Sequence, residues 1–161
     1  MNRTLAIAGA VALTGVLAGA GLSTLGGPAA AETEAAGRAV TLDLHVANDQ
    51  FAAHDIGQPG KSLGDMTVYS DKMVRDGREV GEDGGTCVVT HVDGPRSISN
   101  CVLTIRLAEG QLTAQGLWDD GTSPMQMAIT GGTGAYRNAR GYLQAWDIHT
   151  PKERYRIQVS L

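Results

Sequence analysis

The chain has 161 residues, of which 42% are hydrophobic, with 13 basic and 17 acidic side chains and a net charge of −4. This acidic balance, with basic residues scattered along the chain, excludes a basic nucleic-acid-binding face. Once the first thirty-odd residues are set aside, the length suits a single domain with one core.

The N-terminal segment has the layout of a secretory signal peptide. Arg3 supplies a positive charge, Leu5 to Leu25 carries none, and the small residues Ala29 to Ala31 follow Pro28. An uncharged run of this length could also span a membrane. However, six glycines lie between positions 9 and 27, and acidic rather than basic residues follow. The pattern therefore favours a cleaved signal over an anchor.

The expected domain organisation follows from this cleavage. We expect a signal peptide at 1–31, a flexible N-terminal segment at 32–39 and one folded domain at 40–161. Cleavage removes a single charged side chain and changes the net charge from −4 to −5. The expected location is secreted, either extracellular or associated with the cell surface, with no membrane attachment after cleavage.

Beyond residue 38 apolar and polar residues alternate with a period of two. The pattern is clearest at Val40–Val46, Cys101–Leu107 and Tyr155–Leu161, and it is typical of strands with one buried face. Shorter strand candidates lie at 66–70, 86–92, 111–118, 125–130 and 141–148. No helical segment of 10–15 residues separates them, which argues against a parallel α/β sheet.

Turn signals separate these runs. They lie at 58–60, 76–77, 82–85, 93–95, 109–110 and 119–121. Glycine supplies the positive φ that tight turns require, and Asp or Pro supplies the local geometry. Short strands with regularly spaced turns predict an all-β sandwich or barrel.

The two cysteines flank one of these turns. In an exported protein an even pair of cysteines predicts a disulfide. If the turn centres on Gly94, Cys87 and Cys101 are equidistant from it and face each other across a hairpin, within disulfide reach. Closing a loop of about 15 residues would stabilise the fold by roughly 3 kcal/mol. The alternative is two free thiols on the core face.

A glycine-rich run, Ala128–Gly141, resembles a nucleotide loop only superficially. The dinucleotide pattern requires glycine where Arg137 stands, and the phosphate loop requires a lysine that the run lacks. Neither pattern lies between a strand and a helix. We expect these glycines to serve a sharp bend instead.

The same run resembles the signature of the barrel superfamily that contains plant allene oxide cyclases and dirigent proteins, where ITGGTG, an aromatic residue and ARG recur. Further blocks that agree are Ser62-Leu63-Gly64-Asp65 with Val68-Tyr69, Val80-Gly81 with Gly85-Thr86-Cys87-Val88-Val89, and His54-Asp55-Ile56. The resemblance covers about 40–160. It implies a closed eight-stranded antiparallel β-barrel, whose interior can hold packed side chains or one small ligand.

The resemblance also implies a function. In the plant cyclases the lumen binds an unstable fatty-acid epoxide and steers its ring closure, and dirigent proteins orient phenoxy radicals or quinone methides. The expectation is a secreted barrel that binds a small, largely apolar or phenolic molecule and steers its cyclisation, isomerisation or stereoselective coupling. Val46 stands where the cyclases have an acidic residue, so the plant reaction itself is not expected.

Other functional classes stay open at this point. A non-catalytic carrier of a lipid-like or phenolic ligand and a cell-surface structural or interaction protein are the alternatives, and homo-oligomerisation is undecided. If the chain is an enzyme, it is expected to be an isomerase or cyclase without a cofactor. No metal is expected, because the spacing of the four histidines matches no metal site.

Candidate site residues come from the same resemblance. Asp55 and Arg140 match the dirigent-like acid and the arginine of the motif, and are the catalytic candidates. Asn48, Cys87 and Trp118 match pocket residues of the cyclases and are the substrate-binding candidates. Each has a structural alternative: Asp55 starting a turn, Arg140 pairing at the glycine-rich corner, and Trp118 packing in the core.

Overall fold

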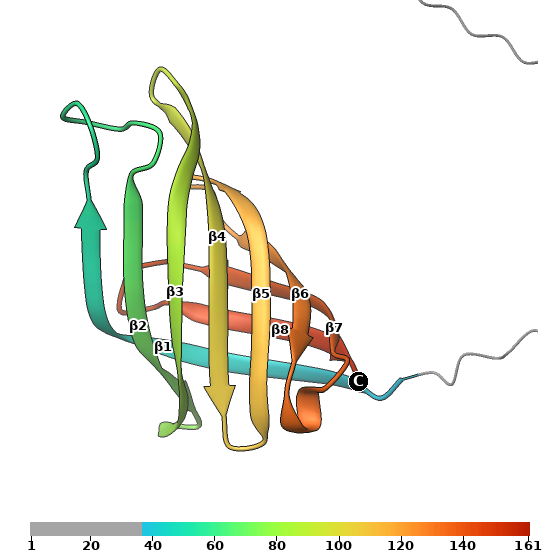
Figure 1. Cartoon of the computed structure of the whole chain (residues 1–161). Helices are drawn as coiled ribbons and strands as arrows, with labels where there is room; N and C mark the ends of the chain where they lie inside the picture. The colour runs from blue at the N-terminus through green and yellow to red at the C-terminus, as the bar shows by residue number, and fades with distance from the viewer. Residues whose placement is uncertain (1–36) are drawn as a thin grey trace, which may run out of the picture. The chain divides into compact units, whose positions relative to one another are not determined.

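The computed structural model describes residues 37–161, so the expected signal peptide and most of the expected N-terminal segment lie outside the described residues. Eight strands form a closed antiparallel barrel in which each pairs with the next and β8 pairs with β1 (Figure 1). The strands are β1 Ala39–His54, β2 Met66–Arg75, β3 Arg78–Asp93, β4 Arg96–Leu107, β5 Gly110–Asp119, β6 Met125–Gly132, β7 Arg140–Trp146 and β8 Arg154–Ser160. The expected fold is confirmed.

Helix is almost absent from the described residues. A single 3-10 turn, η1 at Gly134–Tyr136, lies between β6 and β7. Residues 37–161 contain no helix with the length and apolarity that a membrane crossing requires.

The period-two alternation places one face of every strand inside the barrel. Buried side chains fill the end at which β1 begins, which we call the closed end; they include Leu44, Met73, Ile105, Leu112, Leu143 and Ile157. The other end, at which β1 finishes, is called the open end, and the connections β1–β2, β3–β4, β5–β6 and β7–β8 lie there. The apolar core therefore closes one end and leaves the connecting loops around the other.

The glycine-rich motif closes the barrel at the closed end. Gly134 has φ +59, and a side chain there would collide with the carbonyl oxygen of Glu109. A Cβ at Gly132 would approach the carbonyl oxygens of Gln111 and Tyr136 to 2.6 and 2.5 Å. These glycines let the β6–β7 corner pack directly on the β4–β5 hairpin, which confirms the expected bend.

The β3–β4 hairpin confirms the predicted cysteine pairing. Cys87 and Cys101 are register partners on the two strands, and their sulfur atoms form a disulfide. The register shifts by one between Val89 and His91, so the pairing nearer the turn differs from the symmetric expectation.

The expected turn at 82–85 is wrong. This segment is the middle of β3, which pairs without interruption from Gly81 to Val88 with β2 and β4. The glycine here serves packing instead of chain reversal. Gly85 faces Tyr69 across the β2–β3 ladder, and a Cβ on it would lie 2.5 Å from the tyrosine hydroxyl. The missing side chain makes room for the tyrosine ring.

Candidate active site in the barrel lumen

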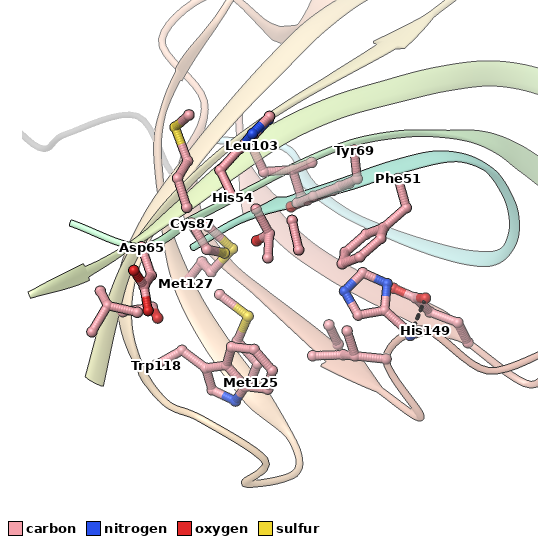
Figure 2. A pocket seen from close by; sticks show the side chains of 18 of the residues that line it. Phe51, His54, Asp65, Tyr69, Cys87, Leu103, Trp118, Met125, Met127 and His149 are labelled. Carbon is pink, nitrogen blue, oxygen red and sulfur yellow. Dashed lines mark hydrogen bonds between the residues drawn. The ribbon is translucent and has the colours of Figure 1, made fainter. Parts of the chain in front are cut away.

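The barrel interior is hollow toward the open end. A cavity of about 400 Å³ lies there, with a wall of apolar, sulfur-containing and aromatic side chains (Figure 2). Leu103, Met127 and Leu143 form its inner part, and the exposed Phe51 and His54 stand at its rim. A volume of this size suits one small organic molecule.

Aromatic rings flank the cavity on two sides. The ring of His149 packs edge-on against Phe51, with 4.7 Å between centroids, and also faces Tyr69 at 6.1 Å. Trp118 lies beside Met125 on the other side in Figure 2, and its indole N–H donates to the carbonyl oxygen of Thr122 at 3.0 Å. Rings on two sides of a cavity favour a flat aromatic ligand.

Polar groups reach the cavity from its mouth, where Asp55, Lys61 and Asp65 line it, and from one region of its wall. Glu153, which directly precedes β8, is 2% exposed and lines the cavity together with Tyr155 and Tyr69. Its Oε2 accepts hydrogen bonds from the His149 backbone N–H at 2.7 Å and from Asn48 Nδ2 at 2.9 Å. Both of its side-chain hydrogen bonds within residues 37–161 go to Oε2, which leaves Oε1 for a ligand.

The β7–β8 connection holds Glu153 in place by an unusual backbone path. Asp147 and His149 both have positive φ, at 54° and 59°, a region that residues other than glycine rarely adopt. The Glu153 N–H donates to the carbonyl oxygen of Thr150, and the Glu153 carbonyl accepts from the Val46 N–H. Sparsely populated backbone conformations of this kind cluster at functional sites.

Two further carboxyl groups lie in the interior beside this group. Asp71 and Asp83 are register partners on β2 and β3, and they are 3% and 5% exposed. Asp71 Oδ1 accepts from the Asp49 N–H at 3.1 Å and from Asn48 Nδ2 at 3.4 Å. Asp83 Oδ1 accepts from the Asp71 N–H at 3.1 Å, whereas its Oδ2 is buried and has no hydrogen bond.

The electrostatics of the region follow from this burial. Burial, together with the nearby charges of Asp71 and Glu153, raises the pKa of Asp83 to about 7, although the nearby Tyr155 hydroxyl acts in the opposite direction. Burial and then the charge of Asp83 raise the pKa of both Tyr69 and Tyr155. The two phenols are therefore protonated hydrogen-bond donors at neutral pH. The two phenol donors and the acceptor Glu153 therefore line the same part of the cavity wall.

The β1–β2 loop covers part of the mouth. Asp65 organises it: its carboxylate accepts from the backbone N–H groups of Ile56 and Ser62, both at 2.8 Å, and these bonds lower its pKa. Lys61 reaches across the mouth and pairs with Asp120 at 2.7 Å. The loop is thus fastened to the β5–β6 connection.

The structure separates the two catalytic candidates. Asp55 lies at the rim and accepts a hydrogen bond from the Gly60 N–H at 3.0 Å, so it shapes its turn as well as lining the cavity. Arg140 begins β7 at the closed end, where it pairs in register with Ser160, and its guanidinium donates to the carbonyl oxygen of Ala139. A joint site of Asp55 and Arg140 has no support in this geometry.

The substrate-binding candidates lie closer to the cavity. Cys87 and Trp118 line it, Cys87 as part of the disulfide. Asn48 is not among the lining residues, but its amide links Asp71 to Glu153, so it holds two of the carboxyl groups.

Sequence reasoning missed the carboxyl groups themselves. Asp83 fell within the expected turn, and Asp71 lay beyond the end of the expected strand 66–70. For Glu153 the sequence offered only its place just before the alternating strand at the C-terminus. Tyr155 could have been found, because that alternation puts it on the inward face.

Comparison with known proteins agrees with the fold. Residues 40–161 match the family of allene oxide cyclase barrel-like domains. A solved pyocyanin demethylase is 44% identical, with a TM-score of 0.73, covering 75% of this chain and 100% of that chain. The comparison with curated proteins gives no match.

More distant solved structures share the fold. The Diels–Alderase AbmU from Streptomyces koyangensis is 20% identical with a TM-score of 0.60, covering 75% of this chain and 62% of its own. A pterocarpan synthase dirigent protein is 21% identical, also with a TM-score of 0.60, covering 76% of this chain and 88% of its own. At this level of identity both show the architecture alone.

Proposed function

Because this chain belongs to the allene oxide cyclase barrel-like family, we propose that it is a cofactor-free enzyme that binds a planar, largely apolar aromatic heterocycle and moves a proton on it. The observation that carries the proposal is the lumen itself. One carboxylate with a free oxygen, Glu153, and two phenol donors, Tyr69 and Tyr155, share an otherwise largely apolar cavity.

Isomerisation is the reaction class that suits these groups best. Glu153 accepts a proton from one position of the bound ring system, and a proton is returned at another position, so that no atom or electron is gained or lost. A phenol hydroxyl from Tyr155 or Tyr69 stabilises the negative charge that develops on the ring between the two steps. Cyclisation and coupling draw support only from the fold shared with distant structures.

The demethylase relative supports the choice of an aromatic heterocycle. Its name assigns it pyocyanin, which is a flat, N-methylated heterocycle, and 44% identity over its entire length makes a similar ligand class reasonable for this chain. The rings of Trp118 and His149 are suited to the two faces of such a molecule.

The test is turnover by the purified protein without any added cofactor. We expect the visible spectrum of pyocyanin, or of a close heteroaromatic, to change, and mass spectrometry to find an isomer of equal mass. Glu153→Gln keeps an oxygen acceptor for Asn48 and His149 and should lower kcat at least a hundredfold, with melting close to the parent.

A matched control and two contrary results complete the experiment. Glu79→Gln removes the same charge from the outer surface, where Glu79 is 60% exposed in its side chain and lies 3.5 Å from Lys72, and should leave kcat unchanged. Binding without turnover across a panel of aromatic heterocycles would show a carrier instead. No binding of any member would reject the proposal.

A further inference from the structure

The barrel interior contains three carboxyl groups, of which Glu153 lines the cavity. Asp71, Asp83 and Glu153 are all buried, and none of them takes part in an ion pair within residues 37–161. The one lysine at the cavity is Lys61, which stands at the mouth and is engaged with Asp120 at 2.7 Å.

Hydrogen bonds satisfy this charge only in part. Asp71 and Glu153 share the amide of Asn48, and each accepts one further backbone N–H. Asp83 Oδ2 is buried without a hydrogen bond, and the Tyr155 hydroxyl is the nearby donor that lowers the pKa of this group. Burial is also the first cause of the raised pKa of Asp83, and the charges of its two carboxyl neighbours add to it. A buried carboxylate without a counter-charge is costly, and a cation beside it offsets that cost.

The walls restrict what such a cation can be. Apart from the polar region around Glu153 and the charged residues of the mouth, the cavity is bordered by residues such as Leu103, Met127 and Trp118, with the rings of Phe51 and His149 at the side. A compact, strongly hydrated ammonium ion would lose its water against these walls. A flat ring with delocalised positive charge keeps favourable contact with aromatic and sulfur-containing side chains and attracts the carboxylates.

We propose that the lumen selects N-alkylated heteroarenium cations over neutral aromatic rings of the same size, and that Glu153 is the residue that recognises the charge. The inference rests on the proposed binding of planar aromatics and adds the charge of the ligand to it. Oε1 of Glu153 faces the ring nitrogen, while the carbon skeleton packs on the apolar wall.

The test compares two ligands that differ by one methyl group and one charge. Phenazine is neutral, and N-methylphenazinium is its cationic counterpart of nearly equal size. Titration calorimetry at pH 7.5 should give the cation at least tenfold higher affinity in the parent protein. Glu153→Gln should lower the affinity for N-methylphenazinium at least tenfold and leave that for phenazine within threefold. Glu79→Gln should change neither.

A second variant guards against an effect of misfolding. Asp83→Asn removes another interior carboxyl group that lies outside the cavity lining, and it should reduce the preference for the cation by a smaller factor. Thermal melting and phenazine affinity show whether each variant retains its lumen. Equal affinity for the two ligands in the parent would overturn the inference and leave aromatic binding intact. Failure of both ligands to bind would overturn the proposed function and this inference together.

Discussion

Asp83 lies inside the barrel, and its Oδ2 makes no hydrogen bond. Its pKa is about 7, so the carboxyl group changes its protonation state near neutral pH. In an unfolded chain an aspartate titrates near 4. Between about pH 4 and 7 the folded protein therefore holds a proton that the unfolded chain has lost. The free energy of unfolding falls as the pH rises through this interval and levels off above it.

The corresponding prediction concerns Asp83→Asn. The substitution removes this pH dependence, which amounts to at most about 4 kcal/mol for the difference between the two pKa values. We expect the variant to be more stable than the parent at pH 8 and similar at pH 4.5, as measured by urea unfolding at several pH values. A variant that retains the full slope of the parent would show that a group other than Asp83 holds the proton.

Gly85 makes a second prediction possible, because its neighbour provides a matched control. A Cβ at Gly85 would lie 2.5 Å from the Tyr69 hydroxyl and 2.8 Å from the Val102 carbonyl oxygen. At Gly84 the nearest atom is 3.6 Å away. Gly85→Ala should displace the tyrosine ring, weaken ligand binding and cost roughly 1–3 kcal/mol. Gly84→Ala should leave binding as it is, measured by titration and unfolding. Equal binding by both variants would mean that Tyr69 does not contribute to the ligand site.

Of the individual residues of the candidate site, only some could be identified from the sequence. Cys87 and Trp118 were proposed because they match pocket positions of the cyclases, and both line the cavity. Asp71 and Asp83 were not found, because an acidic residue in a strand is indistinguishable from one on a solvated face until barrel closure fixes the inside. Glu153 depends on a loop whose path includes two positive φ angles, which no pattern predicts.

The strands themselves were largely predictable, since alternation reports directly on which face is buried. The strand ends were less so. β1 was expected at Val40–Val46 and extends to His54, because its second half is exposed and a bulge between Asn48 and Gln50 interrupts the pattern. β3 extends through the glycines at 84 and 85, where composition suggested a turn. Pairing with neighbouring strands on both sides overrode the local signal.

Removing the disulfide tests whether the β3–β4 hairpin depends on its crosslink. Cys87 and Cys101 pair across strands that remain hydrogen-bonded from Gly81 to Asp93, so the hairpin does not depend on the crosslink. Replacing both by Ala should lower the free energy of unfolding by about 2–4 kcal/mol and keep the strand-dominated circular dichroism spectrum. Thiol labelling of the native parent checks the premise, since rapid modification of both cysteines would show free thiols.

Across the whole molecule, the two barrel ends are made differently. The closed end is filled by aliphatic side chains and sealed by the glycine-rich corner, so it supplies stability. The open end carries the β1–β2 loop with Lys61 fastened to Asp120, and the cavity beneath it has the polar groups. Closure removes exposed sheet edges, and this lets one end be hollow without exposing unpaired backbone.

The crosslinked barrel also bears on where the protein works. Disulfides form and persist in oxidising compartments, and the charge-free run after Arg3 followed by Ala29–Ala31 is the layout of a signal that leads there. Since β1 begins at Ala39, removal of residues 1–31 takes nothing from the barrel. We propose that the mature protein is secreted and starts at or near Glu32.

Expression of the full chain in a secreting bacterial host tests this. Intact-mass measurement of the exported protein should give a chain beginning near Glu32 that is two hydrogens lighter than its reduced form. Signal peptidase requires small residues before the cleaved bond. The double variant Ala29→Gln/Ala31→Gln should therefore accumulate as uncleaved precursor, whereas Ala35→Gln, just beyond the expected site, should be processed normally. Recovery of a folded, oxidised barrel that still carries residues 1–31 outside the cell would contradict cleavage, and its retention in the cytoplasm with free thiols would contradict secretion as well.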